Sequence, residues 1–153
     1  MIASEGDMRF QRFDDRYQLR LESGEELGAT LKDFCTERQI GFAQMTGLGA
    51  VRSATVAYWN SFSEQYETHE LNDQMEVVSL IGNVAIRDGE PFSHIHLGLG
   101  RSDLTVIGGH FNAAVAHPML EIWLTPIDAT VTRVLDESCG LYLMDLAERT
   151  SSP

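Results

Sequence analysis

Short segments of alternating hydrophobicity fill most of this 153-residue chain, and they constrain its fold more than any other feature. The segments are rich in β-branched and aromatic residues, which is typical of strands whose alternate side chains face a core. Strands are predicted over residues 9–21, 50–59, 75–87, 92–100, 104–108, 121–128 and 141–146. Asp88-Gly89 is a turn signal that joins two of these strands as a hairpin. Consecutive strands of this kind favour a largely antiparallel β-sheet.

One segment has helical spacing instead. Its apolar residues recur at intervals of three and four and would form a single face: Leu27, Leu31, Phe34 and Cys35. Ser23 is the expected N-cap, Glu25 and Glu26 are expected in the first turn, and the helix should end near Gln39. One main helix packed on a largely antiparallel sheet predicts the α+β class.

The length suits a single domain, expected over residues 8–147 with flexible termini at 1–7 and 148–153. No apolar run reaches the roughly 20 residues that cross a bilayer, and the N-terminus lacks the apolar segment of a secretory signal. Cys35 and Cys139 are too far apart for a Cys-x-x-Cys motif. Two reduced thiols in a cytoplasmic protein are therefore expected.

The net charge argues against two kinds of surface. The chain carries 11 basic and 23 acidic residues, which gives a formal net charge of −12. Phosphate contacts need clustered Lys and Arg, so direct binding to nucleic acid is not expected, and neither is attachment to an anionic membrane. Residues 64–90 are rich in carboxylates and are expected to form a solvated acidic rim.

Three histidines form the candidate metal site. His94 and His96 flank Ile95 within a predicted strand, where alternate residues point to the same face. His110 follows Gly108-Gly109 at the end of the next predicted strand, and a short turn would bring it back beside the first two. Paired imidazoles suit a divalent metal such as zinc. The alternative interpretation is a polar, exposed sheet face without a metal.

Three neutral imidazoles would leave the fourth tetrahedral position of zinc open to water or substrate. Glu121 is a candidate fourth ligand or general base, and Arg101 is a candidate partner for a substrate carboxylate. A closed structural site, completed by another residue or by a neighbouring subunit, is the alternative. His69 and His117 are expected to be ordinary surface histidines.

The segment Thr46-Gly47-Leu48-Gly49-Ala50 is only superficially similar to a dinucleotide fingerprint. It lacks the third glycine, and a strand rather than a helix follows it. A tight turn that lets two backbones approach is the preferred interpretation.

Several short motifs occur along the chain in a fixed order. They are Leu19-Arg20-Leu21, Gly24-Glu25-Glu26-Leu27, Thr46-Gly47-Leu48-Gly49-Ala50, Ser79-Leu80-Ile81-Gly82-Asn83-Val84, Asp88-Gly89-Glu90-Pro91-Phe92, His94-Ile95-His96 and Gly108-Gly109-His110. Together they resemble the prokaryotic branch of the plants-and-prokaryotes-conserved (PPC) domain family over residues 9–146. The resemblance implies a compact α+β domain that assembles as a homotrimer, with a metal site at His94, His96 and His110. Plant members carry their DNA contact on an AT-hook, and this sequence contains none.

The fold implied by this resemblance is also similar to that of acetolactate decarboxylase, a zinc enzyme with a histidine pair and a third histidine. Three hypotheses about function follow. The first is a metal-binding oligomeric protein, regulatory or associated with DNA through a protein partner. The second is a zinc enzyme acting on a small hydroxy- or oxo-acid, and the third is a protein that binds DNA directly.

Overall fold

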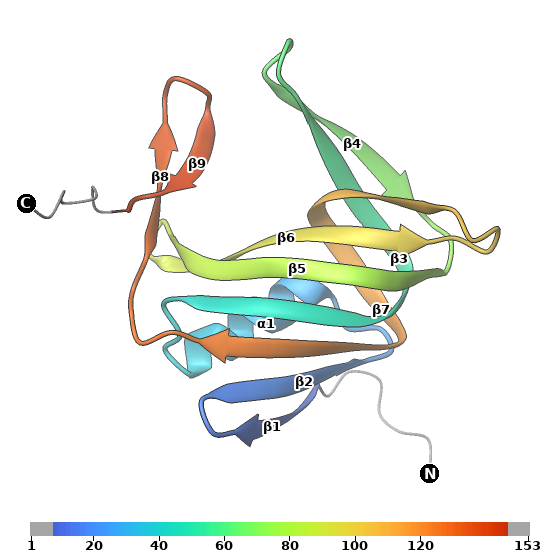
Figure 1. Cartoon of the computed structure of the whole chain (residues 1–153), viewed down its shortest axis with the longest axis horizontal. Coiled ribbons are helices and arrows are strands. Elements are labelled where there is room, and N and C mark those ends of the chain that lie inside the picture. The colour runs from blue at the N-terminus through green and yellow to red at the C-terminus, as the bar shows by residue number, and fades with distance from the viewer. Residues whose placement is uncertain (1–7, 147–153) are drawn as a thin grey trace, which may run out of the picture.

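The computed structural model describes residues 8–146, which form nine strands and one helix (Figure 1). The strands are β1 (Arg9–Phe13), β2 (Arg16–Glu22), β3 (Ala43–Asn60), β4 (Gln65–Leu71), β5 (Met75–Arg87), β6 (Glu90–Gly100), β7 (Val106–Pro126), β8 (Thr132–Asp136) and β9 (Leu141–Met144). The helix is α1 (Leu27–Glu37). The termini predicted to be flexible, residues 1–7 and 148–153, lie outside the described residues. Within residues 8–146, no helix is long and apolar enough to cross a membrane.

The predicted α+β fold with a largely antiparallel sheet is confirmed. Every pair of strands is antiparallel except β5 and β8. The pairings β3–β5, β5–β6, β6–β7 and β7–β3 form a closed circuit, so the sheet curls around its inner face. The helix α1 packs against β6 and β7 (Figure 1). The sheet therefore has a covered inner face and an outer face that the helix does not cover.

The core lies between the helix and the inner face. The four apolar helix residues predicted to form one face, from Leu27 to Cys35, are all buried. They meet alternate strand residues that are likewise buried, among them Leu19, Ile95 and Leu97. Each large aliphatic side chain that is removed from water stabilises the fold by about 1.5–3 kcal/mol.

The start of the helix differs from the prediction. Gly24 has a φ of +97°, so the chain turns there, and the helix begins only at Leu27. Glu26 is the N-cap in place of Ser23, since its carboxylate accepts a hydrogen bond from the Ala29 N–H at 2.7 Å. The predicted acidic first turn is wrong for the same reason, because Glu25 and Glu26 both precede the helix.

Several predicted strand boundaries are also wrong. Most of the two strands predicted over 104–108 and 121–128 belongs to one long strand, β7 (Val106–Pro126). This strand continues through His117-Pro118, which lies at a shift in the β3–β7 register. The strand predicted over 9–21 is a hairpin, since Asp14 has a φ of 51° and turns the chain between β1 and β2. Long bent strands and tight hairpins both obscure the period-two pattern on which the prediction rests.

The glycine-rich segment from Thr46 to Ala50 lies inside β3 and is not a tight turn. The expected close approach of two backbones is nevertheless present. A Cβ atom on Gly47 would lie 2.6 Å from the Glu121 carbonyl oxygen, and one on Gly49 would lie 2.4 Å from the Met119 carbonyl oxygen. The two glycines therefore allow β3 and β7 to pack without a side chain between them.

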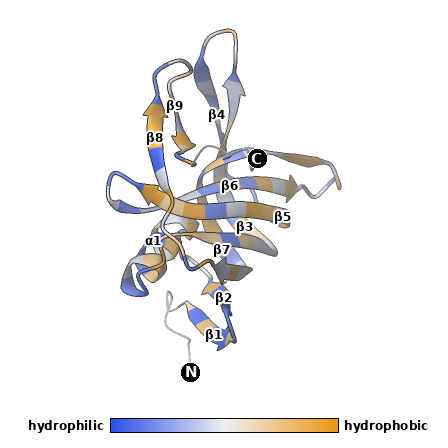
Figure 2. Ribbon diagram, turned by 60° about the vertical axis from the view of Figure 1, so that its left-hand side comes forward, coloured by the Kyte–Doolittle hydropathy of each residue, from blue (hydrophilic) through white to orange (hydrophobic). Residues whose placement is uncertain are grey.

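The acidic stretch 64–90 is divided between two different elements. Its first part contains β4, which pairs with the end of β3, exposes nearly all of its residues and is mostly pale to blue in Figure 2. Its second part contains β5, in which Met75, Val77 and Leu80 are buried on the two sides of a register shift between Val77 and Ser79. Only the first part fits the predicted solvated rim.

Candidate metal centre

The three candidate histidines lie together on the outer face of the sheet. His94 and His96 are on β6, and His110 on β7 is the direct register partner of His96. The alternate residues of β6, Ile95 and Leu97, are buried in the core. Because side chains alternate across a strand, burial of Ile95 turns its two histidine neighbours outward.

The geometry of the cluster suits a shared metal ion. One ligand nitrogen from each histidine can be chosen so that all three lie within 4.8 Å of one another. The ring centroids are 5.3 Å apart for His94 and His96, 5.2 Å for His94 and His110, and 5.6 Å for His96 and His110. Tetrahedral zinc with Zn–N bonds of about 2.0–2.1 Å holds its nitrogens about 3.4 Å apart, so the ligand nitrogens would approach one another by at most about 1.4 Å on binding.

The two glycines before His110 allow the strands around it to approach closely. A Cβ atom on Gly108 would lie 2.0 Å from the Leu97 carbonyl oxygen on β6, and one on Gly109 would lie 2.6 Å from the Ala57 carbonyl oxygen on β3. Neither glycine has a positive φ, so close approach is the reason for glycine at both positions. The absence of side chains at Gly108 and Gly109 thus allows His110 to lie beside His96.

The environment keeps two of the imidazoles neutral. Burial is the main cause that lowers the pKa of His94 to about 4, and the nearby charge of Arg133 is the next. Burial also lowers the pKa of His110, followed by the effect of His96. A neutral imidazole retains the lone pair that a metal needs, so both rings are in the required form at neutral pH.

Arg133 is a site residue that sequence reasoning missed. It lies on β8, is buried, and its Nη1 donates a hydrogen bond to the Tyr142 carbonyl oxygen at 3.1 Å. Its Nη2 donates to Asn83 Oδ1 at 2.9 Å and lies 3.2 Å from His94 Nδ1. A guanidinium can only donate, so Nδ1 accepts and the proton of the neutral His94 ring is on Nε2. The only sequence signal for Arg133 is its place in a short alternating run.

The other candidate residues are not at the histidine cluster. Glu121 lies on β7 opposite Arg20 and Leu48, where it lines a separate depression with Arg20. Arg101 is exposed in the turn between β6 and β7. Neither position supports the predicted role beside the metal.

The two histidines expected on the surface are both exposed. His69 lies on β4, where it pairs with Val56 of β3. His117 Nδ1 is 2.8 Å from Ser23 Oγ, so the residue expected to cap the helix instead contacts this ring. Neither histidine joins the cluster on the outer face.

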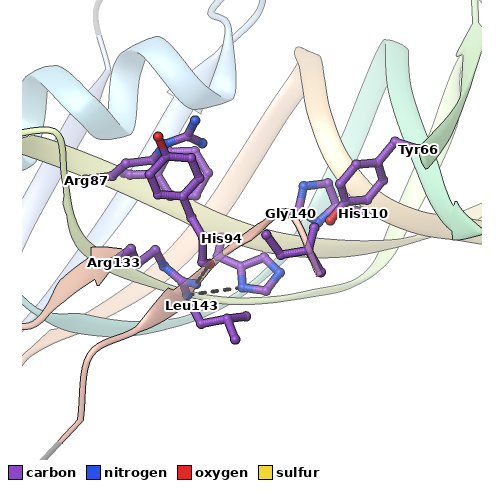
Figure 3. A pocket seen from close by; sticks show the side chains of 10 residues that line it. Tyr66, Arg87, His94, His110, Arg133, Gly140 and Leu143 are labelled. Atoms are coloured by element: carbon purple, nitrogen blue, oxygen red, sulfur yellow. Dashed lines mark hydrogen bonds between the residues drawn. The ribbon is translucent and has the colours of Figure 1, made fainter. Parts of the chain in front are cut away.

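A pocket of about 300 Å³ opens beside the cluster (Figure 3). Its lining includes residues of the β3–β4 and β8–β9 hairpins, which project from the sheet in Figure 1. His94 and His110 form part of its wall, Tyr66 enters from β4, and Arg133 enters from β8. The Tyr66 and His110 rings are stacked with centroids 4.9 Å apart. Two of the three imidazoles are therefore accessible to a small molecule within the pocket.

Comparison with known proteins places the chain in a family. Residues 8–128 match the Plants and Prokaryotes Conserved (PCC) domain, which is also abbreviated PPC. No curated protein matches the chain. A metal-containing protein from Archaeoglobus fulgidus is 33% identical, with a TM-score of 0.80 over 91% of this chain and 96% of that one. A plant- and prokaryote-conserved (PPC) protein from Pyrococcus horikoshii is 30% identical, with a TM-score of 0.80 over 97% of this chain and 99% of that one.

A protein from Bacteroides thetaiotaomicron is 24% identical, with a TM-score of 0.86 over 90% of this chain and 96% of that one, and it shows the fold alone. The expected likeness to acetolactate decarboxylase stays a prediction. The family match covers most of the chain, and two structures at 30% identity or more share its whole fold. This chain therefore belongs to the Plants and Prokaryotes Conserved domain family.

Proposed function

We propose that the protein binds zinc through His94, His96 and His110. The observation that carries the proposal is the register of β6 and β7, which brings three imidazole nitrogens within 4.8 Å of one another. An all-imidazole ligand set suits zinc among the divalent metals of cells. The 33% identical protein from Archaeoglobus fulgidus is described as metal-containing, which supports the same property here.

Metal binding requires a change at Arg133. If His94 binds the metal through Nδ1, the metal takes the lone pair that now accepts the hydrogen bond from Arg133. If His94 binds through Nε2, the ring proton must move to Nδ1, which can then no longer accept. In both cases Arg133 gives up its hydrogen bond to His94, and its bonds to Asn83 and Tyr142 hold it in place.

The site has the chemistry of an open metal centre. Three neutral imidazoles leave zinc one position for water or another ligand, and the pocket beside His94 and His110 gives small molecules access to that position. A bound zinc would lower the pKa of a coordinated water and polarise a ligand oxygen. Tyr66, stacked on His110, shields one side of the cluster from solvent.

Metal analysis of the full chain, purified without a histidine tag, tests this proposal. We expect one zinc per chain, loss of zinc in His96→Ala, and unchanged zinc in the matched variant His69→Ala, since His69 is exposed on β4. Equal zinc content in the wild type and His96→Ala would refute the proposal, and so would no zinc uptake by the wild type during dialysis.

We further propose that the protein is a cytoplasmic homotrimer and that any association with DNA goes through a partner. The outer face exposes several large apolar side chains that another subunit could cover: Leu48, Val78, Ile81, Val106 and Trp123. Covering such a face is a common reason for oligomerisation. Light scattering should give three times the chain mass of 17.1 kDa, and a monomer mass would refute the trimer.

A DNA shift assay at several salt concentrations tests the second part of this proposal. With a net charge of −12, the chain should not retard duplex DNA at micromolar concentration and physiological salt. Sub-micromolar, salt-sensitive binding would show that the contact is direct.

A further inference from the structure

Positive charge is concentrated in the pocket beside the histidines. The parallel register of β5 and β8 places Arg87 next to Arg133, and both line the pocket (Figure 3). None of the lining residues that the structure describes is acidic, although the whole chain has a net charge of −12. Two adjacent guanidinium groups repel each other, so this arrangement is more favourable when an anion lies between them.

Arg133 is a buried cation without a buried counter-ion. The residue is only 8% exposed, and its three hydrogen-bond partners are all neutral. Its Nε is buried and has no hydrogen-bond partner among the described residues. A charge removed from water in this way is costly unless an opposite charge pairs with it.

Arg87 is held in place by aromatic rings. Its guanidinium carbon lies 3.8 Å from the centre of the Tyr142 ring and 5.1 Å from that of Phe92. Its Nε is 3.5 Å from the carboxylate of Asp88, which is exposed in the adjoining turn and does not line the pocket. Stacking fixes the plane of the guanidinium, so less side-chain entropy is lost when it binds a ligand.

The walls of the pocket indicate an organic ligand. Leu141, Leu143 and Phe92 form apolar parts of the lining, and a volume of about 300 Å³ is at the lower end of the range of small-molecule sites. The planar fork of arginine matches the two oxygens of a carboxylate. We propose that this pocket binds a small organic acid whose carboxylate pairs with Arg87 and Arg133 and whose apolar part contacts Leu143.

The proposed binding of an organic acid depends on the two arginines and not on the metal. The metal-free and the zinc-loaded protein can therefore both be tested. Titration calorimetry with the full chain, metal-free and zinc-loaded, would use benzoate as the probe. Benzamide has the same shape without the charge, and inorganic phosphate is an oxyanion without an apolar part. We expect benzoate to bind with a Kd below about 1 mM and benzamide to bind at least about tenfold more weakly.

Three variants locate the binding. Arg87→Gln and Arg133→Lys should each weaken benzoate binding about tenfold or more, because each loses forked, charge-assisted hydrogen bonds. The matched control Arg101→Gln removes an exposed arginine in the turn after β6 and should bind benzoate as the wild type does. Melting temperatures of the ligand-free variants show whether each variant is folded. If Arg133→Lys does not fold, the benzoate affinity of Arg87→Gln tests the proposal.

The outcomes separate this inference from the proposed metal site. Zinc uptake without benzoate binding in either form would overturn the organic-acid site alone. Benzoate binding without zinc uptake would overturn the metal site alone. Tighter binding of phosphate than of benzoate, or equal benzoate binding by Arg87→Gln and the wild type, would also refute the organic-acid site.

Discussion

Gly108→Ala is the sharpest test of how the strands position the histidines. Gly108 on β7 is the register partner of Gly98 on β6. A Cβ atom on Gly108 would lie 2.0 Å from the Leu97 carbonyl oxygen, whereas one on Gly98 would meet its nearest neighbours at 3.4 Å. Gly108→Ala should therefore force β6 and β7 apart, and Gly98→Ala should be tolerated.

The structure gives the size of the effect. Real Cβ atoms essentially never have contacts under 3.0 Å, so the strands must separate by about 1 Å at this point. The β6–β7 pairing has only five register pairs, so the shift disturbs a large part of it. Overpacking costs about 1–3 kcal/mol and each lost hydrogen bond about 1 kcal/mol, for a total of about 3–5 kcal/mol. That corresponds to a fall in melting temperature of roughly 10–20 °C.

Thermal unfolding followed by circular dichroism measures this effect in the metal-free protein. Gly98→Ala should melt within about 3 °C of the wild type, in line with a cost below 1 kcal/mol. Gly108→Ala should also bind zinc more weakly, because His96 and His110 lie on the two strands that separate. A melting temperature of Gly108→Ala close to that of Gly98→Ala would refute the reasoning.

Three further predictions concern other groups. Burial raises the pKa of the Cys35 thiol to about 12, so iodoacetamide should label Cys139 and spare Cys35 in the folded protein; double labelling by mass spectrometry would contradict this. The pKa of His94, lowered by burial and then by Arg133 to about 4, means that the unfolded chain binds a proton first as the pH falls below about 6.5. Lowering the pH from about 6.5 to about 4 should therefore destabilise the metal-free wild type relative to His94→Asn. A difference in melting temperature between the two proteins that stays constant over this range would refute the prediction. Glu26→Ala removes the helix N-cap and should cost about 1–2 kcal/mol, which urea unfolding measures; an unchanged midpoint would count against that role.

Local patterns predicted much of the fold. Helical spacing identified the buried face of α1, and the Asp88-Gly89 turn correctly joined β5 to β6. Alternation along β6 was enough to place His94 and His96 on one face, because that property depends only on neighbouring residues. The three histidines lie together as predicted, and the structure shows that the Gly-Gly pair before His110 allows the strands to approach closely.

The sequence by itself thus determined the fold class, the buried face of the helix and the histidine cluster, all of which follow from short-range periodicity. The tertiary structure alone decided which arginines accompany the cluster. Arg133 reaches His94 because β8 pairs in parallel with β5, and the same register sets Arg133 beside Arg87. Glu121 and Arg101, chosen from the sequence, lie elsewhere. Register between strands far apart in sequence depends on bulges and on how the whole core packs, so no local pattern encodes it.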